Sequence, residues 1–94
     1  MTRRVVVLGA GISGLGAAVL AKKKGFDVFV SEKEKIADNS KKFLLNNDIN
    51  WEEGRHSLEQ IIIADEVIKS PGIADTIPLI DKLNLYNVPV ISEI

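Results

Sequence analysis

The chain has 94 residues, with 12 basic and 13 acidic side chains and a formal net charge of -1. This length suffices for one hydrophobic core and not for two, and the near-neutral charge excludes an overall attraction to nucleic acid or to an anionic membrane surface. Because the chain has no cysteine, it has neither disulfides nor a thiolate nucleophile, which fits a reducing compartment.

The start of the chain superficially resembles a secretory signal, because Thr2, Arg3 and Arg4 precede a largely apolar stretch over residues 5–21. Glycines interrupt this stretch, and lysines follow it where a small-residue cleavage site would lie. No uninterrupted apolar run approaches the roughly 20 residues that a membrane-spanning helix needs. We therefore expect a cytoplasmic protein that does not enter a membrane.

Strands and helices are predicted to alternate along the chain. The first strand is a continuous apolar run ending in glycine, which is typical of a strand buried on both faces. Ser57 and Gln60 have the spacing of a capping box, and Pro89 places the last strand at an edge of the sheet. The predicted strands cover residues 5–8, 27–31, 50–53, 66–69 and 88–91, and the predicted helices cover residues 13–24, 37–47, 57–63 and 78–86.

This strict alternation predicts an α/β fold with right-handed crossovers and helices on both faces of a parallel sheet. We expect a Rossmann-like three-layer α/β/α architecture with a five-stranded parallel sheet in the order 3-2-1-4-5, and a single domain over residues 1–94. Ligands of such sheets bind beyond the carboxyl ends of the strands where the winding reverses. The loops after the first, second and fourth strands should therefore surround one crevice.

The segment Gly9–Gly14 has the spacing G-x-G-x-x-G between a predicted strand and a predicted helix, and in that context the pattern indicates nucleotide binding. Gly9 permits a tight turn, Gly11 lets the backbone approach a phosphate, and Gly14 lets the helix pack closely. The N-terminus of the helix offers free N–H groups and partial positive charge to a diphosphate. The alternative is a glycine-rich turn that serves packing only.

Two further segments face the predicted crevice. Glu32 ends the second strand, near the spacing at which an acidic side chain meets a ribose or base; the alternative is a solvated glutamate in a charged run. Ser70, Pro71 and Gly72 follow the fourth strand and present a hydroxyl and backbone N–H groups, although an ordinary turn would have the same pattern.

The sequence contains no residue pattern that predicts a catalytic or metal-binding site within this chain. His56 is the single histidine and has no partner at metal-ligand spacing, so it is interpreted as a polar loop residue. Neither a Ser-His-Asp nor a Cys-His arrangement can be assembled, and no Gly-Lys dipeptide occurs, so a P-loop is absent. The chain alone is therefore expected to catalyse nothing and to bind no metal.

Three landmarks occur along the chain: the glycine-rich segment over residues 5–16, Val-Ser-Glu-Lys at 30–33 and Lys-Ser-Pro-Gly-Ile at 69–73. Together with the ending Val-Ile-Ser-Glu-Ile, they resemble the N-terminal domain of the UDP-N-acetylmuramoyl-L-alanine:D-glutamate ligases, a family of Mur ligases of peptidoglycan synthesis. The resemblance covers essentially the whole chain, and its most specific part is Ser-Pro-Gly-Ile after the fourth strand.

The resemblance implies that this domain binds the UDP of UDP-N-acetylmuramoyl-L-alanine. The backbone at Ile12 and Ser13 would contact the diphosphate, Glu32 and Lys33 would flank the uracil, and Ser70–Gly72 would line the nucleotide from the other side. The family usually has Asp where this chain has Glu32. A central ATP-binding domain, which uses ATP and Mg²⁺, and a C-terminal domain would complete the ligase, and no cofactor is implied for the N-terminal domain itself.

Two other functions fit part of the sequence. The strand, glycine motif, helix and terminal glutamate would suit the FAD-binding or NAD-binding N-terminal segment of a flavoprotein oxidoreductase, although residues 33–42 lack the glycines that usually follow there. A free-standing NAD-sensing regulatory module is the second alternative, since 94 residues suffice for the fold.

Overall fold

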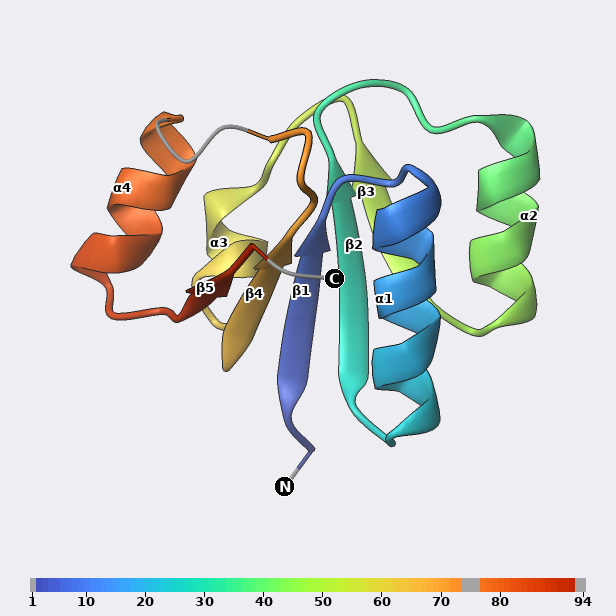
Figure 1. The fold of residues 1–94 in the computed structure, drawn as a ribbon, viewed down its shortest axis with the longest axis horizontal. Coiled ribbons are helices and arrows are strands. Elements are labelled where there is room, and N and C mark those ends of the chain that lie inside the picture. Colours follow the sequence, from blue (N-terminus) through green and yellow to red (C-terminus); the bar gives the residue numbers. More distant parts are fainter. Residues whose placement is uncertain (1, 74–76, 93–94) are drawn as a thin grey trace.

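A parallel five-stranded sheet forms the centre of the molecule (Figure 1). The computed structural model describes residues 2–73 and 77–92. The strand order is β3-β2-β1-β4-β5, and all four neighbouring pairs are parallel, so the predicted topology is confirmed. The strands are β1 (Arg4–Leu8), β2 (Asp27–Glu32), β3 (Asn50–Glu53), β4 (Glu66–Lys69) and β5 (Val90–Ile91).

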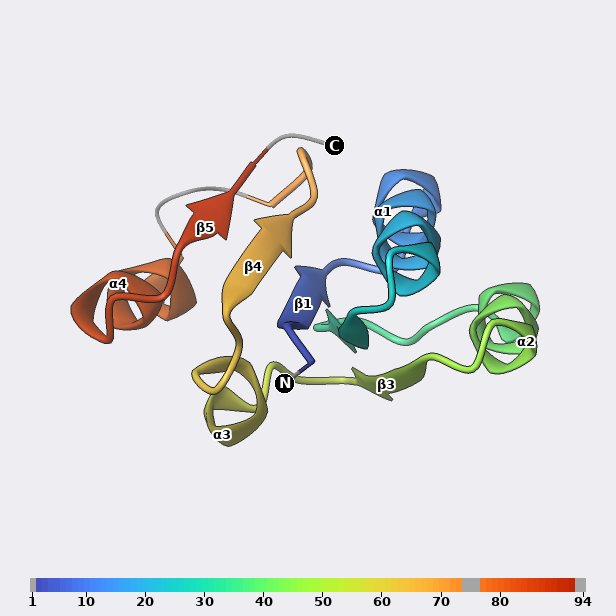
Figure 2. The ribbon, with the colours of Figure 1, turned by 90° about the horizontal axis from the view of Figure 1, so that it is seen from below.

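In the described ranges, 2–73 and 77–92, four helices lie on the two faces of the sheet; Figure 2 shows this arrangement from below. Two of them pack on one face and two on the other, which gives the predicted three layers. In the part of the chain that the structure describes, no helix has the length and apolarity to cross a bilayer. The helices are α1 (Ile12–Lys23), α2 (Asp38–Asn46), α3 (Leu58–Ile61) and α4 (Pro78–Leu85).

The central strand β1 joins two hydrophobic clusters because its side chains alternate between the faces of the sheet. Val5 and Val7 pack into the cluster beneath α1 and α2, whereas Val6 and Leu8 pack into the cluster beneath α3 and α4. All four side chains are almost completely buried. The prediction that the first strand is buried on both faces is confirmed, and its carboxyl end is thereby fixed at mid-sheet.

The amino edge of the sheet is held together by Arg4. Its guanidinium donates to Asp27 at 3.0 Å and to the carbonyl oxygen of Gln60 at 3.1 Å, and lies over the ring of Phe29. The backbone N–H of Arg4 donates to Asp65 at 2.7 Å. Arg4 thus connects β1 to β2 and to the segment that leads from α3 into β4.

The predicted capping box at the start of α3 is wrong. Ser57 is the N-cap residue, but its side chain makes no capping hydrogen bond, and its buried Oγ has no partner among the described residues. The backbone N–H of Ser57 donates to Glu52 at 2.7 Å, and the Gln60 amide oxygen accepts from Arg4 at 3.2 Å. Both capping partners are therefore taken by other residues, and α3 ends at Ile61 rather than at Ile63.

The edge strand β5 is shorter than the predicted strand over residues 88–91. The N–H of Val88 donates to Leu83 at the end of α4, so Val88 terminates the helix instead of joining the sheet. The carbonyl oxygen of Pro89 accepts from Val67 of β4. The predicted position of this strand at the sheet edge is confirmed.

Candidate functional site

A cavity of about 810 Å³ lies at the carboxyl edge of the sheet; this edge is uppermost in Figure 1. This volume lies within the range of small-molecule sites. The loops after β1, β2 and β4 all contribute, as predicted, together with the loop after β3 and the start of α4. The lining residues are Gly9, Gly11, Ile12, Ser13, Gly14, Glu32, Lys33, Glu34, His56, Ser70, Pro71, Gly72, Ile73, Ile77, Pro78 and Leu79.

The glycines of the first turn have different surroundings. Gly9 has a φ of 102°, and a Cβ there would lie 2.6 Å from Ser70 Oγ. A Cβ on Gly14 would lie 2.0 Å from the carbonyl oxygen of Gly9. A Cβ on Gly11 would meet nothing within 4 Å. Gly9 and Gly14 are therefore required by the close contacts of the turn, whereas Gly11 keeps open space inside the cavity.

The N-terminus of α1 presents its backbone to this open space. Gly11 is the N-cap, and no side chain caps the helix. The first N–H groups of a helix have no intrahelical acceptor, so those of Ile12, Ser13 and Gly14 are available to a ligand. Ile12 and Ser13 are exposed. This arrangement favours an anion, because the helix dipole places partial positive charge at the same point.

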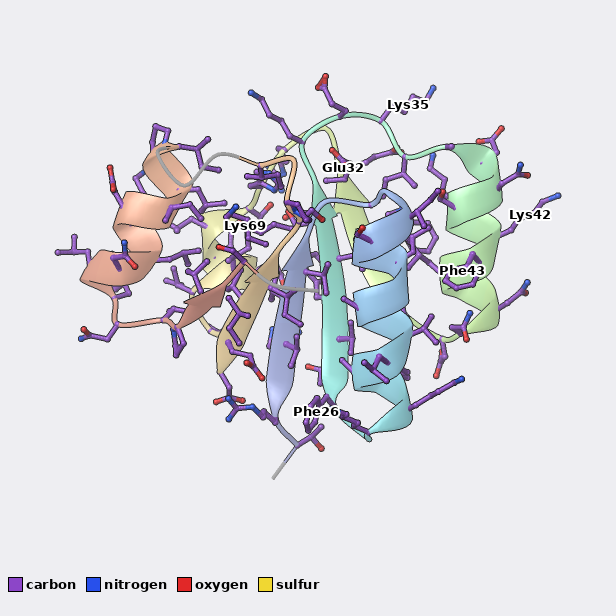
Figure 3. The ribbon with its side chains drawn as sticks, in the orientation of Figure 1. Phe26, Glu32, Lys35, Lys42, Phe43 and Lys69 are labelled. Carbon is purple, nitrogen blue, oxygen red and sulfur yellow. The ribbon has the colours of Figure 1, made fainter. Side chains whose placement is uncertain are left out.

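Glu32 connects two of the loops that line the cavity. Its Oε1 accepts from the backbone N–H of Ala10 at 2.8 Å, and its Oε2 accepts from that of Glu34 at 2.9 Å. Figure 3 shows Glu32 at the upper end of β2, beside the loop that leads into α1. Glu32 thus lies where the sequence predicts it, and its carboxylate fixes the turn after β1 relative to the loop after β2.

Glu53 holds the rest of the loop after β2. Its Oε1 accepts from the N–H of Ile36 at 2.8 Å, and its Oε2 lies 2.8 Å from Lys41 Nζ. The hydrogen bond from Lys41, followed by that from Ile36, lowers the pKa of Glu53. Lys33 lines the cavity, whereas the exposed Lys35 points away into solvent (Figure 3).

The turn after β4 forms the opposite wall of the cavity. The N–H of Ser70 donates to Leu8 at 3.1 Å, and the carbonyl oxygen of Ser70 accepts from Ile73 at 3.0 Å. The buried ammonium of Lys69 donates to the carbonyl oxygen of Ile73. Ser70 Oγ is buried and has no hydrogen-bond partner in the described part of the chain. A hydrogen-bonded turn therefore places a hydroxyl that has no partner in the described residues beside Gly9.

His56 is a cavity residue that the sequence did not reveal as one. Its Nδ1 lies 2.7 Å from Ser31 Oγ, which in turn lies 2.8 Å from Glu52 Oε2. Burial lowers the pKa of His56; the Glu32 and Glu52 carboxylates oppose this shift, and Lys33 adds to it. Residues 2–73 and 77–92 contain no cluster of side chains suited to a metal ion.

Comparison with known families identifies a match over most of the chain. The description of the matching family is "MurD N-terminal domain", and the match covers residues 4–77. Two relatives are UDP-N-acetylmuramoylalanine--D-glutamate ligases. The chain is 60% identical to the one from Bacteroides fragilis over 92 residues, and 49% identical to the one from Christiangramia forsetii over 94 residues. The two alignments cover 98% and 100% of this chain, respectively. The chain spans only 21% of the length of either relative.

Solved structures share the fold. The UDP-N-acetylmuramate-alanine ligase MurC from Thermotoga maritima matches with a TM-score of 0.74 and 26% identity, over 96% of this chain and 20% of that one. A UDP-N-acetylmuramate:L-alanyl-gamma-D-glutamyl-meso-diaminopimelate ligase from Neisseria matches with a TM-score of 0.80 over 97% of this chain and 28% of that one, but at 19% identity it supports the fold alone.

The family match decides between the three functions that the sequence left open. It covers the glycine turn, Glu32 and the Ser70–Gly72 turn together, whereas the flavoprotein and NAD-sensing alternatives rested on the glycine turn and the glutamate. The topology, the cavity and the sequence relatives agree. The chain belongs to the family of MurD N-terminal domains.

Proposed function

We propose that this chain binds the UDP moiety of UDP-N-acetylmuramoyl-L-alanine for a ligase that adds D-glutamate to it. The observation that carries the proposal is the open, uncapped N-terminus of α1 in the cavity, next to the space that Gly11 leaves free. Relatives at 49–60% identity are named for that ligation. The proposal includes a cytoplasmic site of action, where a nucleotide-linked cell-wall precursor would be used.

The cavity suggests how the nucleotide would lie. The backbone N–H groups of Gly11–Gly14 would bind the diphosphate, and the nucleoside would extend along the sheet edge toward Glu32 and Lys33. The Ser70–Gly72 turn would contact the nucleotide from the other side, with Ser70 Oγ as a donor that has no internal partner. The ligand would thus bridge the loops of three neighbouring strands.

The reaction itself would take place outside these residues. Activation of a carboxylate as an acyl phosphate by ATP and Mg²⁺, followed by attack of the D-glutamate amine, needs a phosphate-binding P-loop that this sequence lacks. In this proposal residues 1–94 form one domain, and central ATP-binding and C-terminal domains supply the chemistry. The contribution of the present chain would be to position the substrate.

Gly11→Ala tests the proposal because it separates ligand binding from folding. The new methyl group meets nothing within 4 Å in the protein, and Gly11 has the ordinary extended φ of -76°, so stability should fall by no more than about 1 kcal/mol, the usual effect of a poor N-cap. The methyl group would occupy the space of a phosphate. Calorimetric titration with UDP should show affinity reduced at least tenfold, about 1.4 kcal/mol.

Gly16→Ala is the matched control, since a Cβ there also meets nothing within 4 Å and Gly16 does not line the cavity. This variant should bind UDP like the parent chain. FAD and NAD titrated in parallel should bind weakly or not at all. Tight FAD binding by a folded chain that ignores UDP, or Gly11→Ala binding UDP as the parent does, would overturn the proposal.

A further inference from the structure

A chain of hydrogen bonds determines which ring nitrogen of His56 carries the proton. When its carboxylate is ionised, Glu52 has no proton to donate and can only accept hydrogen bonds. Burial acts to raise the pKa of Glu52, but hydrogen bonds from Ser57 and Ser31 outweigh burial, and the net shift is downward. The Glu52 carboxylate at 2.8 Å is a closer acceptor for the Ser31 hydroxyl than the carbonyl oxygen of Arg55 at 3.4 Å, so the single hydroxyl proton is donated to Glu52. Ser31 Oγ must then accept from His56 Nδ1, at 2.7 Å.

The consequence is a defined hydrogen-bonding face toward the cavity. A neutral imidazole protonated at Nδ1 has an unprotonated Nε2, which is an acceptor. Burial favours the neutral ring by lowering the pKa of His56, against the opposing carboxylates of Glu32 and Glu52 and with the help of Lys33. Nε2 makes no hydrogen bond within the described residues, and His56 lines the cavity.

The strand order places His56 at the outer end of the cavity. The turn that would bind phosphate follows β1, Glu32 ends β2, and His56 follows β3. Neighbouring strands lie about 4.8 Å apart, so the end of β3 is roughly 10 Å from the end of β1 along the sheet edge. The part of a nucleotide beyond its ribose would reach this end.

Glu34 also lines the cavity, but its side chain is exposed to water, and Glu32, the half-buried carboxylate at this end, is already engaged. Each of its carboxylate oxygens accepts a backbone N–H, from Ala10 and from Glu34. A donor on the base would have to share one of these oxygens, whereas Nε2 of His56 has its lone pair free of any partner in the described part of the chain. The geometry therefore favours the imidazole as the acceptor for the base.

We propose that His56 Nε2 accepts a hydrogen bond from the imide N3–H of uracil, and that Ser31 and Glu52 are positioning residues that hold the ring in the required tautomer. This inference rests on the proposed function, since it assigns UDP to the cavity. It explains selection of the base, because uracil has a donor at N3 where cytosine has an acceptor. His56 is thus a determinant of base specificity rather than a passive loop residue.

The test compares UDP with UDP methylated at N3 of the base, in the parent chain and in His56→Ala. Loss of one buried hydrogen bond to the base should weaken UDP binding by His56→Ala about tenfold. Methylation should weaken binding at least tenfold in the parent chain and little in His56→Ala, because the donor and its acceptor are then both missing. Lys35→Ala, an exposed change outside the cavity, should leave both affinities unchanged.

A spectroscopic measurement tests the positioning residues. His56 is the only histidine, so its two ¹⁵N resonances can be assigned without ambiguity. At neutral pH they should report the Nδ1–H tautomer, and UDP should shift Nε2 while leaving Nδ1 protonated. In Ser31→Ala the tautomers should become mixed and UDP affinity should fall, while the unfolding transition stays cooperative.

The outcomes separate this inference from the proposed function. If the folded parent chain binds no UDP, the proposed function fails. If the parent binds UDP but His56→Ala binds it equally well and still discriminates against the N3-methylated base, the proposed function stands and the role of His56 is refuted. An Nε2–H tautomer in the UDP complex would also refute it.

Discussion

Two glycines of α1 illustrate how surroundings decide the effect of one methyl group. A Cβ on Gly14 would lie 2.0 Å from a backbone oxygen of Gly9, which no side-chain rotation can relieve. Gly14→Ala should therefore destabilise the chain by about 1–3 kcal/mol, the usual cost of overpacking, and should displace the helix from the turn. Urea unfolding measures the free energy, and UDP titration should show weaker binding as well.

Gly16→Ala, in the same helix, should change the free energy of unfolding in the opposite direction. Its Cβ would meet nothing within 4 Å, and replacing a helical glycine by alanine usually stabilises by about 0.5–1 kcal/mol. Equal stabilities for the two variants would show that the turn does not hold the helix as closely as the structure indicates.

At the residue scale, the sequence predicted the positions that follow from local pattern. The glycine turn, Glu32 and Ser70 all line the cavity as expected. The hydrogen bond from Ala10 to Glu32 and the position of His56 in the cavity could not be predicted, because both depend on the register of neighbouring strands. Ser31 lies opposite Glu52 only through the pairing of β2 with β3, and a single histidine in a loop carries no sign of that pairing.

At the scale of elements, Arg4 is expected to affect stability but not binding. Its side chain connects β1 to Asp27 and Gln60 at the amino edge of the sheet, opposite the cavity. Hydrogen bonds to charged groups contribute about 1.5–3 kcal/mol, so Arg4→Ala should lower the free energy of unfolding by about 2 kcal/mol. UDP affinity, measured well below the unfolding midpoint, should not change.

Arg3→Ala is the control for this prediction. Arg3 forms a single exposed ion pair with Glu66 at 3.1 Å, with about half of its side chain in solvent. Such pairs contribute roughly 0–1 kcal/mol. Similar losses of stability in the two variants would mean that the additional contacts of Arg4 contribute nothing.

The order and type of the elements were predictable, whereas their ends depended on tertiary partners. The alternation of short apolar runs with segments of helical spacing allowed each strand and helix of the described residues to be predicted. The capping box failed because Glu52, from the preceding strand, takes the N–H of Ser57. The last strand lost residues because Val88 completes the end of α4. Competition for one backbone group decides such boundaries, and sequence spacing does not describe that competition.

At the scale of the whole molecule, the topology was predictable because few arrangements satisfy right-handed crossovers and burial of the first strand on both faces. That topology also predicted the location of the cavity. Its detailed shape was not predictable, since the loop after β3 enters it through contacts among Ser31, Glu52 and His56.

The chain by itself should bind substrate without converting it. Supplied with ATP, Mg²⁺, UDP-N-acetylmuramoyl-L-alanine and D-glutamate, the 94-residue chain should release no phosphate above the rate of a heat-denatured sample, because it contains no P-loop. A coupled phosphate assay measures this. Phosphate release that depends on D-glutamate would contradict the division of labour proposed above.

The pairing of β1 with both β2 and β4 has a thermodynamic consequence. One crossover unit lies on either side of that central strand, and the cavity takes walls from both. A ligand bound in the cavity would contact both halves of the sheet, so neither half could unfold without releasing the ligand. By mass action, a ligand present at a hundred times its dissociation constant would add about 2.7 kcal/mol to the stability of the entire fold. Ligand binding and cooperative unfolding therefore depend on the same arrangement of strands.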